Sequence, residues 1–418
     1  MTEMNQHTNH NREARNILIA NDRGGYTIPT EGLYPYQWNW DSAIAAVGFA
    51  EFDIDRAWTE VETLFSGQWA DGMVPHILFH KQDDGYFPGP DVWGCNGPIP
   101  SSGIIQPPIA ATMVRKIWEQ DKKVGDQRLR ALFPKLLAWH RWIMKWRLDE
   151  KDAVCTTHPW EAGRDNAPDW DKSMARMDAS DVGEYQRRDI AHVNSDDRPT
   201  KFDYDRYIKL VQIGREAGWN QQALLEKNPF RVADPTMTFT TLRAARDLLA
   251  ISDQLGVDAE GLHSDVERLE NGARSLWNED LGSFDSRDVR TDEWAGSISN
   301  ASYMCWYAGI QSEQMLKRLD AVLDTVPYPV PSYDTSMPNF DARRYWRGPT
   351  WAIMNMMIGF GLADMGHTRQ AEDLRLKTAK LISTYGFAEY FDPNTGSAAG
   401  GTAFTWTAAV WLHWAGRS

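Results

Sequence analysis

The chain has 418 residues, of which 42% are hydrophobic, and a formal net charge of −14. This length can bury a large core, either as one large domain or as several domains of average size. The acidic balance excludes nucleic acid as the main partner, because phosphate binding needs a basic face.

The cysteines and the N-terminal segment bear on the compartment. Cys95, Cys155 and Cys305 are widely spaced and form no CxxC pair, so we expect reduced thiols and no metal site. The segment 1–17 is polar and lacks the apolar run of a signal peptide, and we expect it to be flexible. Since no apolar stretch approaches about 18 residues, the sequence predicts a cytoplasmic protein without a membrane partner.

Apolar residues recur at helical spacing along most of the chain. The first stripes run from Trp58 to Phe65 and from Leu132 to Ile143. Further helices are predicted over 205–217, 236–255, 262–276, 311–324, 349–364, 368–384 and the terminal segment TAFTWTAAVWLHWAG. In the 262–276 stripe, Ser264 and Glu267 are spaced as a capping box. Alternating strand patterns are scarce, so we predict an all-α fold.

Long loops rich in glycine and proline separate the predicted helices. The clearest cover 83–108, 156–171, 326–350 and 387–404. Loops of this length inside a compact domain are usually functional. No linker or break in composition divides the chain, so we predict one domain over 1–418. Helices that alternate with such loops would suit a toroid of helical hairpins.

The loop at 160–171 concentrates acidic side chains between two tryptophans. Glu161, Asp165, Asp169 and Asp171 fall within eleven residues. A carboxylic acid beside aromatic walls is desolvated, which raises its pKa and lets it donate a proton near neutral pH. An acidic surface loop or a helix cap would give the same composition. A calcium site is disfavoured, because the glycine and the distal glutamate of an EF-hand loop are missing.

A second carboxylate lies among aromatic residues close to the end of the sequence. Glu389 is surrounded by Phe387, Tyr390 and Phe391. Glycosidases need two carboxylates on opposite sides of the scissile bond, and Asp165 and Glu389 supply such a pair if the fold brings them together. A structural glutamate paired with an arginine is the alternative.

The clustering of the aromatic residues suggests a carbohydrate-binding site. The chain has 20 Trp, against 14 Tyr and 15 Phe, and sugar rings stack on aromatic faces. The segment 34–41 alternates Tyr and Trp before an acid, and 345–351 is similar in kind. A buried aromatic core is the competing interpretation. Asp41 and Arg347 would be costly inside such a core without partners, which favours binding sites.

Taken together, the motifs resemble bacterial members of glycoside hydrolase family 63, above all its glucosylglycerate and mannosylglycerate hydrolases. The motifs are YPYQWNWDSA, GMVPHI, DGYFPGP, GIIQPP, HPWEAGRDNAPDWD, EYQR, YDRY, YWRGPTW and FAEYFDPNTG…FTWTAA. They run in the family's order from about residue 20 to residue 412. The resemblance implies an (α/α)6 barrel whose long loops, including 83–108 and 181–206, form a lid over the active site.

The resemblance also implies site residues and a mechanism. Asp165 would be the general acid and Glu389 the base that activates water, with inversion at the anomeric carbon and no metal or organic cofactor. Arg206 would clamp a carboxylate, because guanidinium binds carboxylate bidentately. The implied substrate-binding positions are Tyr34, Trp38, Trp40, Asp41, His76, Tyr86, Gln106, Arg206, Tyr345, Trp346 and Trp351. Arg164 and Phe404 depart from the glucosylglycerate hydrolase pattern and would bear on which epimer or aglycone is accepted.

The expected function is that of an inverting, exo-acting α-glycosidase for a small glycoside such as glucosylglycerate or mannosylglycerate. The expected partner is a small carbohydrate, which carries a carboxylate if Arg206 acts as implied. The sequence leaves open whether the chain forms a homo-oligomer. One alternative is another α-glucosidase of the same barrel clan, acting on a neutral disaccharide of the trehalose, kojibiose or nigerose type or on a short oligosaccharide. Another is a non-catalytic sugar-binding protein or an epimerase.

Overall fold

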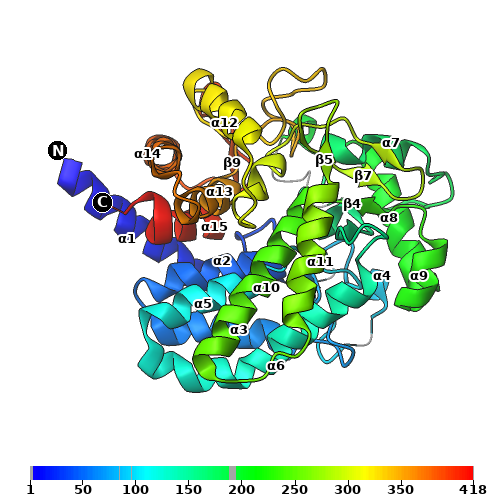
Figure 1. Cartoon of the computed structure of the whole chain (residues 1–418), viewed down its shortest axis with the longest axis horizontal. Helices are drawn as coiled ribbons and strands as arrows, with labels where there is room; N and C mark the ends of the chain where they lie inside the picture. Colours follow the sequence, from blue (N-terminus) through cyan, green and yellow to red (C-terminus); the bar gives the residue numbers. More distant parts are fainter. Residues whose placement is uncertain (1–2, 84, 96, 188–193, 418) are drawn as a thin grey trace.

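Helices arranged in two concentric rings make up most of the chain. The computed structural model describes residues 3–83, 85–95, 97–187 and 194–417. The inner elements are α2 (Asn39–Ala50), α5 (Ala110–Gln120), α10 (Pro235–Leu255), the 3-10 turn η4 (Ser302–Cys305), α13 (Ala352–Asp364) and α15 (Thr405–Val410). Each contacts the next, and α15 closes the ring against α2 (Figure 1).

A second layer of helices packs on the outside of this ring. These are α1 (Glu3–Asn21), α3 (Ile54–Ser66), α6 (Lys122–Trp146), α11 (Leu262–Ser275), α12 (Glu313–Thr325) and α14 (Thr368–Tyr385). They cover α15, α2, α5, α10, η4 and α13 in that order. The fold is therefore an all-α (α/α)6 barrel, as the resemblance implied.

The composition of the helices explains which layer each one occupies. Every residue of α2 up to Phe49 is buried, and α13 is apolar on nearly all sides, so neither has a face to offer to water. In α3, by contrast, Trp58, Val61 and Leu64 form one buried stripe and the remaining face is polar. A helix that is apolar all round needs cover on every side, which fits the inner positions of α2 and α13, whereas the inner helix α5 is amphipathic.

The segment 1–17 differs from the expectation of a flexible N-terminus. From Glu3 onward it belongs to α1, which continues to Asn21 and packs against α15. Ala14, Ile17 and Leu18 are buried at this contact. Arg12, Glu13, Arg15 and Asn16 are exposed and belong to the solvent side of this outer helix.

The capping box predicted at Ser264 and Glu267 is wrong. Helix α11 begins at Leu262 with Gly261 as its N-cap, and no side chain caps it. Leu262 is buried, so packing extends the helix two residues beyond the polar signal. A capping box does occur at Thr200 and Asp203, at the start of α8 (Lys201–Glu216).

The strands are short, and they pair segments of different loops with one another. The strands are β1 (Gln37–Trp38), β2 (Ile77–Leu78), β3 (Cys155–Thr156), β4 (Val232–Ala233), β5 (Trp277–Asn278), β6 (Ser283–Phe284), β7 (Arg287–Asp288), β8 (Glu293–Trp294), β9 (Tyr390–Phe391) and β10 (Ala398–Ala399). All pairs are antiparallel, and the largest sheet has the order β3-β4-β7-β8.

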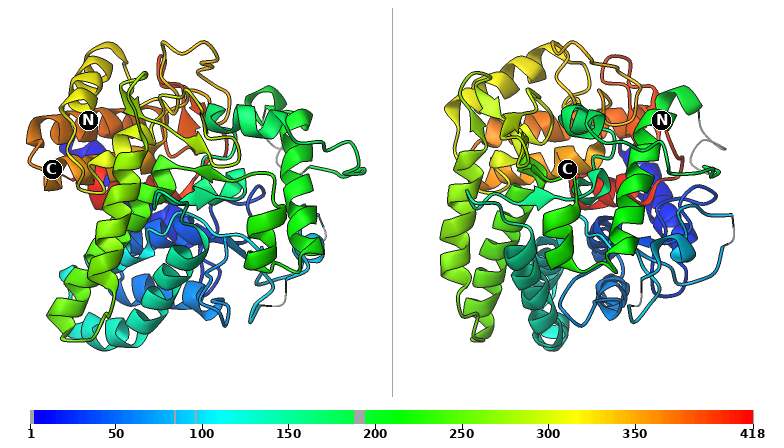
Figure 2. Two further views of the ribbon diagram at one scale, coloured as in Figure 1. Left: turned by 45° about the vertical axis from the view of Figure 1, so that its right-hand side comes forward. Right: turned by 90° about the vertical axis from the view of Figure 1, so that its right-hand side faces the viewer.

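Several short helices lie in the connections between the barrel helices. They are α4 (Pro90–Trp93), η1 (Pro159–Ala162), η2 (Pro168–Trp170), α7 (Asp171–Ala175), η3 (Ser195–Asp197) and α9 (Gln221–Lys227). Together with α8, which stands with α9 to one side of the rings, these connections form the end of the barrel that carries the site (Figures 1 and 2). The π-turn η5 (Trp411–Ala415) follows α15 at the end of the chain and packs against α1 and α14. Among the described residues, no helix is long and apolar enough to cross a membrane.

Hydrogen bonds join the early and late parts of the chain where the ring closes. Asn21 Nδ2 donates to Thr405 Oγ1 at 2.9 Å, and Thr30 Oγ1 donates to the carbonyl oxygen of Thr402 at 2.6 Å. This seam brings the loop that carries Tyr34 against the loop that carries Glu389.

Candidate active site

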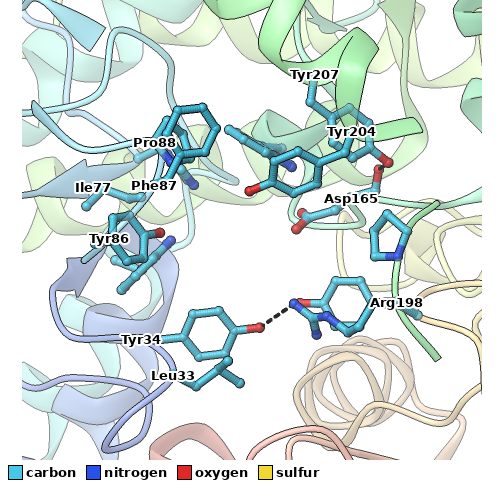
Figure 3. A pocket seen from close by; sticks show the side chains of 15 residues that line it. Leu33, Tyr34, Ile77, Tyr86, Phe87, Pro88, Asp165, Arg198, Tyr204 and Tyr207 are labelled. Carbon is cyan, nitrogen blue, oxygen red and sulfur yellow. Dashed lines mark hydrogen bonds between the residues drawn. The ribbon is translucent and has the colours of Figure 1, made fainter. Parts of the chain in front are cut away.

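A pocket opens among the loops at this end of the barrel. Figure 3 shows the aromatic side chains of Tyr86 and Phe87 facing Asp165, Tyr204 and Tyr207 across the opening. The lining residues are Leu33, Tyr34, Trp38, His76, Ile77, Tyr86, Phe87, Pro88, Trp160, Asp165, Arg198, Pro199, Tyr204, Tyr207 and Tyr345.

Asp165 reaches the pocket from a tightly bound turn between η1 and η2. Gly163 ends η1 with φ 68°, a left-handed conformation that glycine adopts without strain. A Cβ at this position would lie 2.7 Å from the ring of Trp40, so the backbone rests directly on that indole. The hydroxyl of Tyr207 donates to the carbonyl oxygen of Asp165 at 2.8 Å. These contacts fix the backbone from which the Asp165 side chain enters the pocket.

Glu389 lies fully buried behind the pocket and is held by several donors. The hydroxyls of Tyr34 and Tyr345 donate to its Oε1 at 3.0 and 3.1 Å. The backbone N–H of Gly401 donates to Oε2 at 2.9 Å. A Cβ on the neighbouring Gly400, at φ 71°, would lie 2.3 Å from Oε2, so only glycine allows the backbone this close to the carboxylate.

Arg198 joins this cluster from the pocket side. Its Nη2 donates to the Tyr34 hydroxyl at 2.9 Å, its Nη1 is 3.8 Å from Glu389 Oε1, and its guanidinium lies 4.0 Å from the centre of the Tyr345 ring (Figure 3). Burial raises the pKa of Glu389, while the Arg198 charge and the three donors partly offset that rise. A carboxylate with a raised pKa is a stronger base than an exposed one.

Asp41 is the third carboxyl group of the site. It is buried at the first turn of α2, and burial, together with the negative charges of Glu389 and Asp165, raises its pKa well above the ordinary value. Because like charges in a dry site resist ionising together, the two other carboxylates favour the protonated form of Asp41.

Two stacked indoles lie under the pocket next to Tyr345. The rings of Trp346 and Trp351 are 3.8 Å apart and almost parallel, and Trp40 lies 6.3 Å from Trp346. Trp346 has φ 61°, a left-handed conformation that is strained for a bulky residue. Neither the Trp346 nor the Trp351 indole N–H has a hydrogen-bond partner among the described residues. Both rings are buried, and neither lines the pocket.

His76 lines the pocket as a neutral ring. Burial and the nearby His158 lower its pKa well below the ordinary value. Its Nδ1 lies 3.2 Å from the hydroxyl of Ser102, and its ring packs among Trp38 and Trp160. A neutral imidazole can offer one donor or one acceptor to a polar ligand group.

The structure brings most of the predicted site residues to the pocket or directly beneath it. Asp165, Tyr34, Trp38, His76, Tyr86 and Tyr345 line it, whereas Glu389, Trp40, Asp41, Trp346 and Trp351 are buried around the Glu389 cluster. Gln106 is also buried, and its Oε1 accepts the backbone N–H of Trp40 at 3.1 Å. Gln106 therefore supports Trp40 and is not part of the pocket lining. Whether each of these residues contacts substrate stays a prediction.

Arg206 does not line the pocket in this structure, and its role as a carboxylate clamp stays a prediction. Its Nε and Nη1 donate to the carbonyl oxygens of Met174 and Phe202 at 2.7 and 3.0 Å, outside the pocket. In a helix, positions 204 and 207 share one face, and 206 points away from both. The tyrosines of the YDRY motif therefore face the pocket, and the cation comes from Arg198, which the sequence analysis did not single out.

The two departures from the family pattern lie in the interior. Arg164 is fully buried and turns away from the pocket toward Asp169 and Asp234. Phe404 is buried against Trp406 and meets the Tyr34 ring edge-on at 6.0 Å. Any effect of either residue on a ligand would have to act through its neighbours. Closure of the loops 83–108 and 181–206 as a lid stays a prediction, and residues 84, 96 and 188–193 lie outside the described part of the chain.

The site's chemistry rests on carboxyl, hydroxyl and guanidinium groups. Within the described residues, no group of three or more His, Cys, Asp or Glu side chains is arranged to hold a metal ion. One carboxyl group in the pocket, a second one buried behind it and aromatic walls form a set of groups that glycoside hydrolysis can use.

Comparisons with known proteins show the family to which the chain belongs. The family model of the mannosylglycerate hydrolase MGH1-like glycoside hydrolase domain matches residues 34–407. The mannosylglycerate hydrolase MGH1 of Selaginella moellendorffii is 42% identical over 410 residues, which are 96% of this chain and 84% of that protein. A glucosylglycerate hydrolase of Mycolicibacterium hassiacum is 32% identical over 432 residues, 96% of each chain.

A solved structure extends the agreement to the whole fold. The crystal structure of the GH63 mannosylglycerate hydrolase from Thermus thermophilus, in complex with Tris and D-glycerate, matches with a TM-score of 0.93 at 40% sequence identity. The match covers 97% of this chain and 99% of that one. The chain therefore belongs to the mannosylglycerate hydrolase MGH1-like family within glycoside hydrolase family 63, and it is an enzyme that hydrolyses O-glycosyl bonds.

Proposed function

We propose that the enzyme hydrolyses mannosylglycerate with inversion, using Asp165 as general acid and Glu389 as general base. Asp165 gives its proton to the glycosidic oxygen as the bond from that oxygen to the anomeric carbon breaks. Glu389 takes a proton from water as the water oxygen bonds to the same carbon from the opposite face. The products are the free sugar and glycerate, and the proposal includes no cofactor.

The observation that carries the proposal is the cradle around Glu389. A fully buried glutamate with a raised pKa, held by Tyr34, Tyr345 and the N–H of Gly401, is costly unless its charge is used. Asp165 stands in the pocket in front of it. Inverting glycosidases separate the two carboxyl groups by roughly 6.5–9.5 Å so that water fits between substrate and base.

The acidic aglycone is supported by Arg198, the arginine that lines the pocket. Its Nη2 donates to Tyr34, and its positive charge at the pocket attracts the glycerate carboxylate. The relatives at 42% and 40% identity are named mannosylglycerate hydrolases, and the one at 32% a glucosylglycerate hydrolase, which favours mannose over glucose.

The test compares substrates and follows the first turnover. Purified enzyme is assayed on mannosylglycerate, glucosylglycerate, trehalose and kojibiose by release of free sugar, and the anomer formed first is identified by proton NMR. We expect mannosylglycerate to have the highest kcat/KM and the first product to be the β-anomer. An α-anomer as first product would refute inversion, and a preference for trehalose would refute the acidic aglycone.

Variants of the two carboxyl groups test their roles. Asp165→Asn and Glu389→Gln keep the size of each side chain but remove the transferable proton or the basic oxygen. We expect each to lower kcat on mannosylglycerate by at least about 100-fold while the protein stays folded. Near-normal turnover in either variant would refute that residue's assignment.

A further inference from the structure

Arg164 precedes the proposed acid, and its side chain points into the protein. The guanidinium makes four polar contacts in a fully buried cluster. Nη2 lies 2.6 Å from Asp234 Oδ1 and 3.1 Å from Asp169 Oδ1. Nε donates to Thr236 Oγ1 at 2.9 Å, and Nη1 donates to Ser299 Oγ at 3.2 Å.

These partners belong to the rigid framework of the barrel. Asp234 is the N-cap of the inner helix α10 and accepts the backbone N–H of Met237 at 2.9 Å. Ser286 Oγ donates to both Asp169 and Asp234 at 2.9 and 3.3 Å. Arg164 thereby ties its own turn to α10 and to the segment next to β7.

The backbone of Arg164 is held as firmly as its side chain. Its carbonyl oxygen accepts the indole N–H of Trp170 at 2.9 Å and the backbone N–H of Ala167 at 3.0 Å. Gly163, before it, rests on Trp40. With residue 164 fixed inward on one side of the turn, the next side chain, that of Asp165, is directed to the other side, into the pocket.

We propose that Arg164 is a positioning residue for proton donation, which acts by holding the Asp165 carboxyl group at the glycosidic oxygen. This inference rests on the proposed function, because it presupposes that Asp165 is the general acid. It assigns Arg164 no contact with substrate. The consequence is specific: loss of Arg164 impairs the step that needs a proton, and spares steps that do not.

The test uses two substrates that differ in their need for acid. Mannosylglycerate requires protonation of its leaving oxygen, whereas α-mannosyl fluoride releases fluoride ion without it. In Arg164→Met we expect kcat on mannosylglycerate to fall by about 100-fold or more, the contribution of general acid catalysis. Hydrolysis of the fluoride, in which water replaces fluorine at the anomeric carbon, should fall by less than about fivefold because Glu389 is untouched.

A conservative variant guards against a failure to fold. Arg164→Lys keeps the charge opposite Asp234 but loses the planar fork that also reaches Thr236 and Ser299. We expect partial recovery of kcat on mannosylglycerate relative to Arg164→Met, with KM unchanged and fluoride hydrolysis near that of the unmodified enzyme. If Arg164→Met does not fold, the ratio of the two rates in Arg164→Lys decides the question.

Arg243 provides a matched control. It is paired with the buried Asp247 at 2.8 Å and with Asp364 at 2.6 Å, away from the pocket lining. Arg243→Met removes a comparable ion pair and should lower both rates by the same factor. If the Arg164 variants also lower both rates equally, Arg164 is merely structural and the inference is overturned.

Asp165→Asn distinguishes a failure of this inference from a failure of the proposed function. If Asp165→Asn spares the fluoride but the Arg164 variants do not, only the role of Arg164 is refuted. If Asp165→Asn loses both activities equally, Asp165 is not the general acid, and the proposed function and this inference fall together.

Discussion

Removing the hydroxyl of Tyr345 tests how the protein sets the basicity of Glu389. Tyr345→Phe deletes one donor, 3.1 Å from Glu389 Oε1, and keeps the ring that packs against Trp351 and under Arg198. The hydroxyl of Tyr34 and the N–H of Gly401 stay in place. The change is therefore confined to one hydrogen bond to the charged form of the carboxyl group.

The direction of the effect follows from which protonation state is active. The hydrogen bond from Tyr345 favours the carboxylate, so it holds the pKa of Glu389 below the value that burial alone would give. Without it the pKa rises, and the base becomes protonated at a higher pH. Activity that depends on the carboxylate is then lost earlier as the pH falls, so the acid limb of the pH profile moves upward.

The size of the effect can be bounded. A hydrogen bond to a charged group contributes about 1.5–3 kcal/mol, and about 1.4 kcal/mol corresponds to a tenfold change in an equilibrium constant. Because water entering the vacated space offsets part of the loss, we expect the lower end. The midpoint of the acid limb should move upward by about one pH unit.

The assay is kcat/KM on mannosylglycerate between pH 3 and 9, because this parameter reports the free enzyme. Tyr303→Phe is the control, since Tyr303 is buried beside Trp306 and does not contact Glu389. It should leave the acid limb unchanged. An unchanged or lowered midpoint in Tyr345→Phe would refute the reasoning that Tyr345 stabilises the carboxylate of the base.

Arg198→Met should raise KM for mannosylglycerate by about 10- to 100-fold, the loss of a charged hydrogen bond, and leave KM for an aryl α-mannoside largely unchanged. An equal rise for both substrates would speak against a carboxylate contact. Arg206→Ala should change KM for mannosylglycerate by less than about twofold, because its guanidinium lies outside the pocket lining. A tenfold rise in KM would indicate that Arg206 contacts the substrate. Gly163→Ala combines a backbone penalty of about 1–2 kcal/mol with a Cβ at 2.7 Å from Trp40, so calorimetry should show a lower Tm, accompanied by a lower kcat. An unchanged Tm would show that the turn at residue 163 tolerates a side chain.

The sequence predicts the barrel better than the boundaries of its helices. Apolar periodicity located the helices near α10, α12, α13 and α14 to within a few residues. It also placed the start of α11 at Leu262, although the capping box expected at Ser264 and Glu267 does not form. It missed α1, whose few buried residues pack against α15, η5 and α2, contacts that no local pattern reveals.

Site residues could be predicted where the chemistry of a side chain and a sequence motif point to the same position. The carboxyl groups at 165 and 389 and the aromatic residues around them could be named from the sequence. The cation could not, because Arg198 stands in an irregular segment where no periodicity says which way a side chain points. The YDRY motif also does not say which of its members line the pocket. Tyr204 and Tyr207 do and Arg206 does not, because the turn of α8 sets the direction of each side chain.

The seam between the early and late segments has a consequence for how the enzyme matures. Tyr34 and Glu389 are 355 positions apart in the sequence, yet they share a hydrogen bond, and Asn21 and Thr405 are 384 apart. Contacts of such separation are costly to form early in folding, because a long loop must close first. A ribosome-bound chain that has not yet released residue 389 has no base behind its pocket. Turnover therefore requires that the ring has closed. A variant that destabilises this seam should lose activity before the rest of the barrel unfolds.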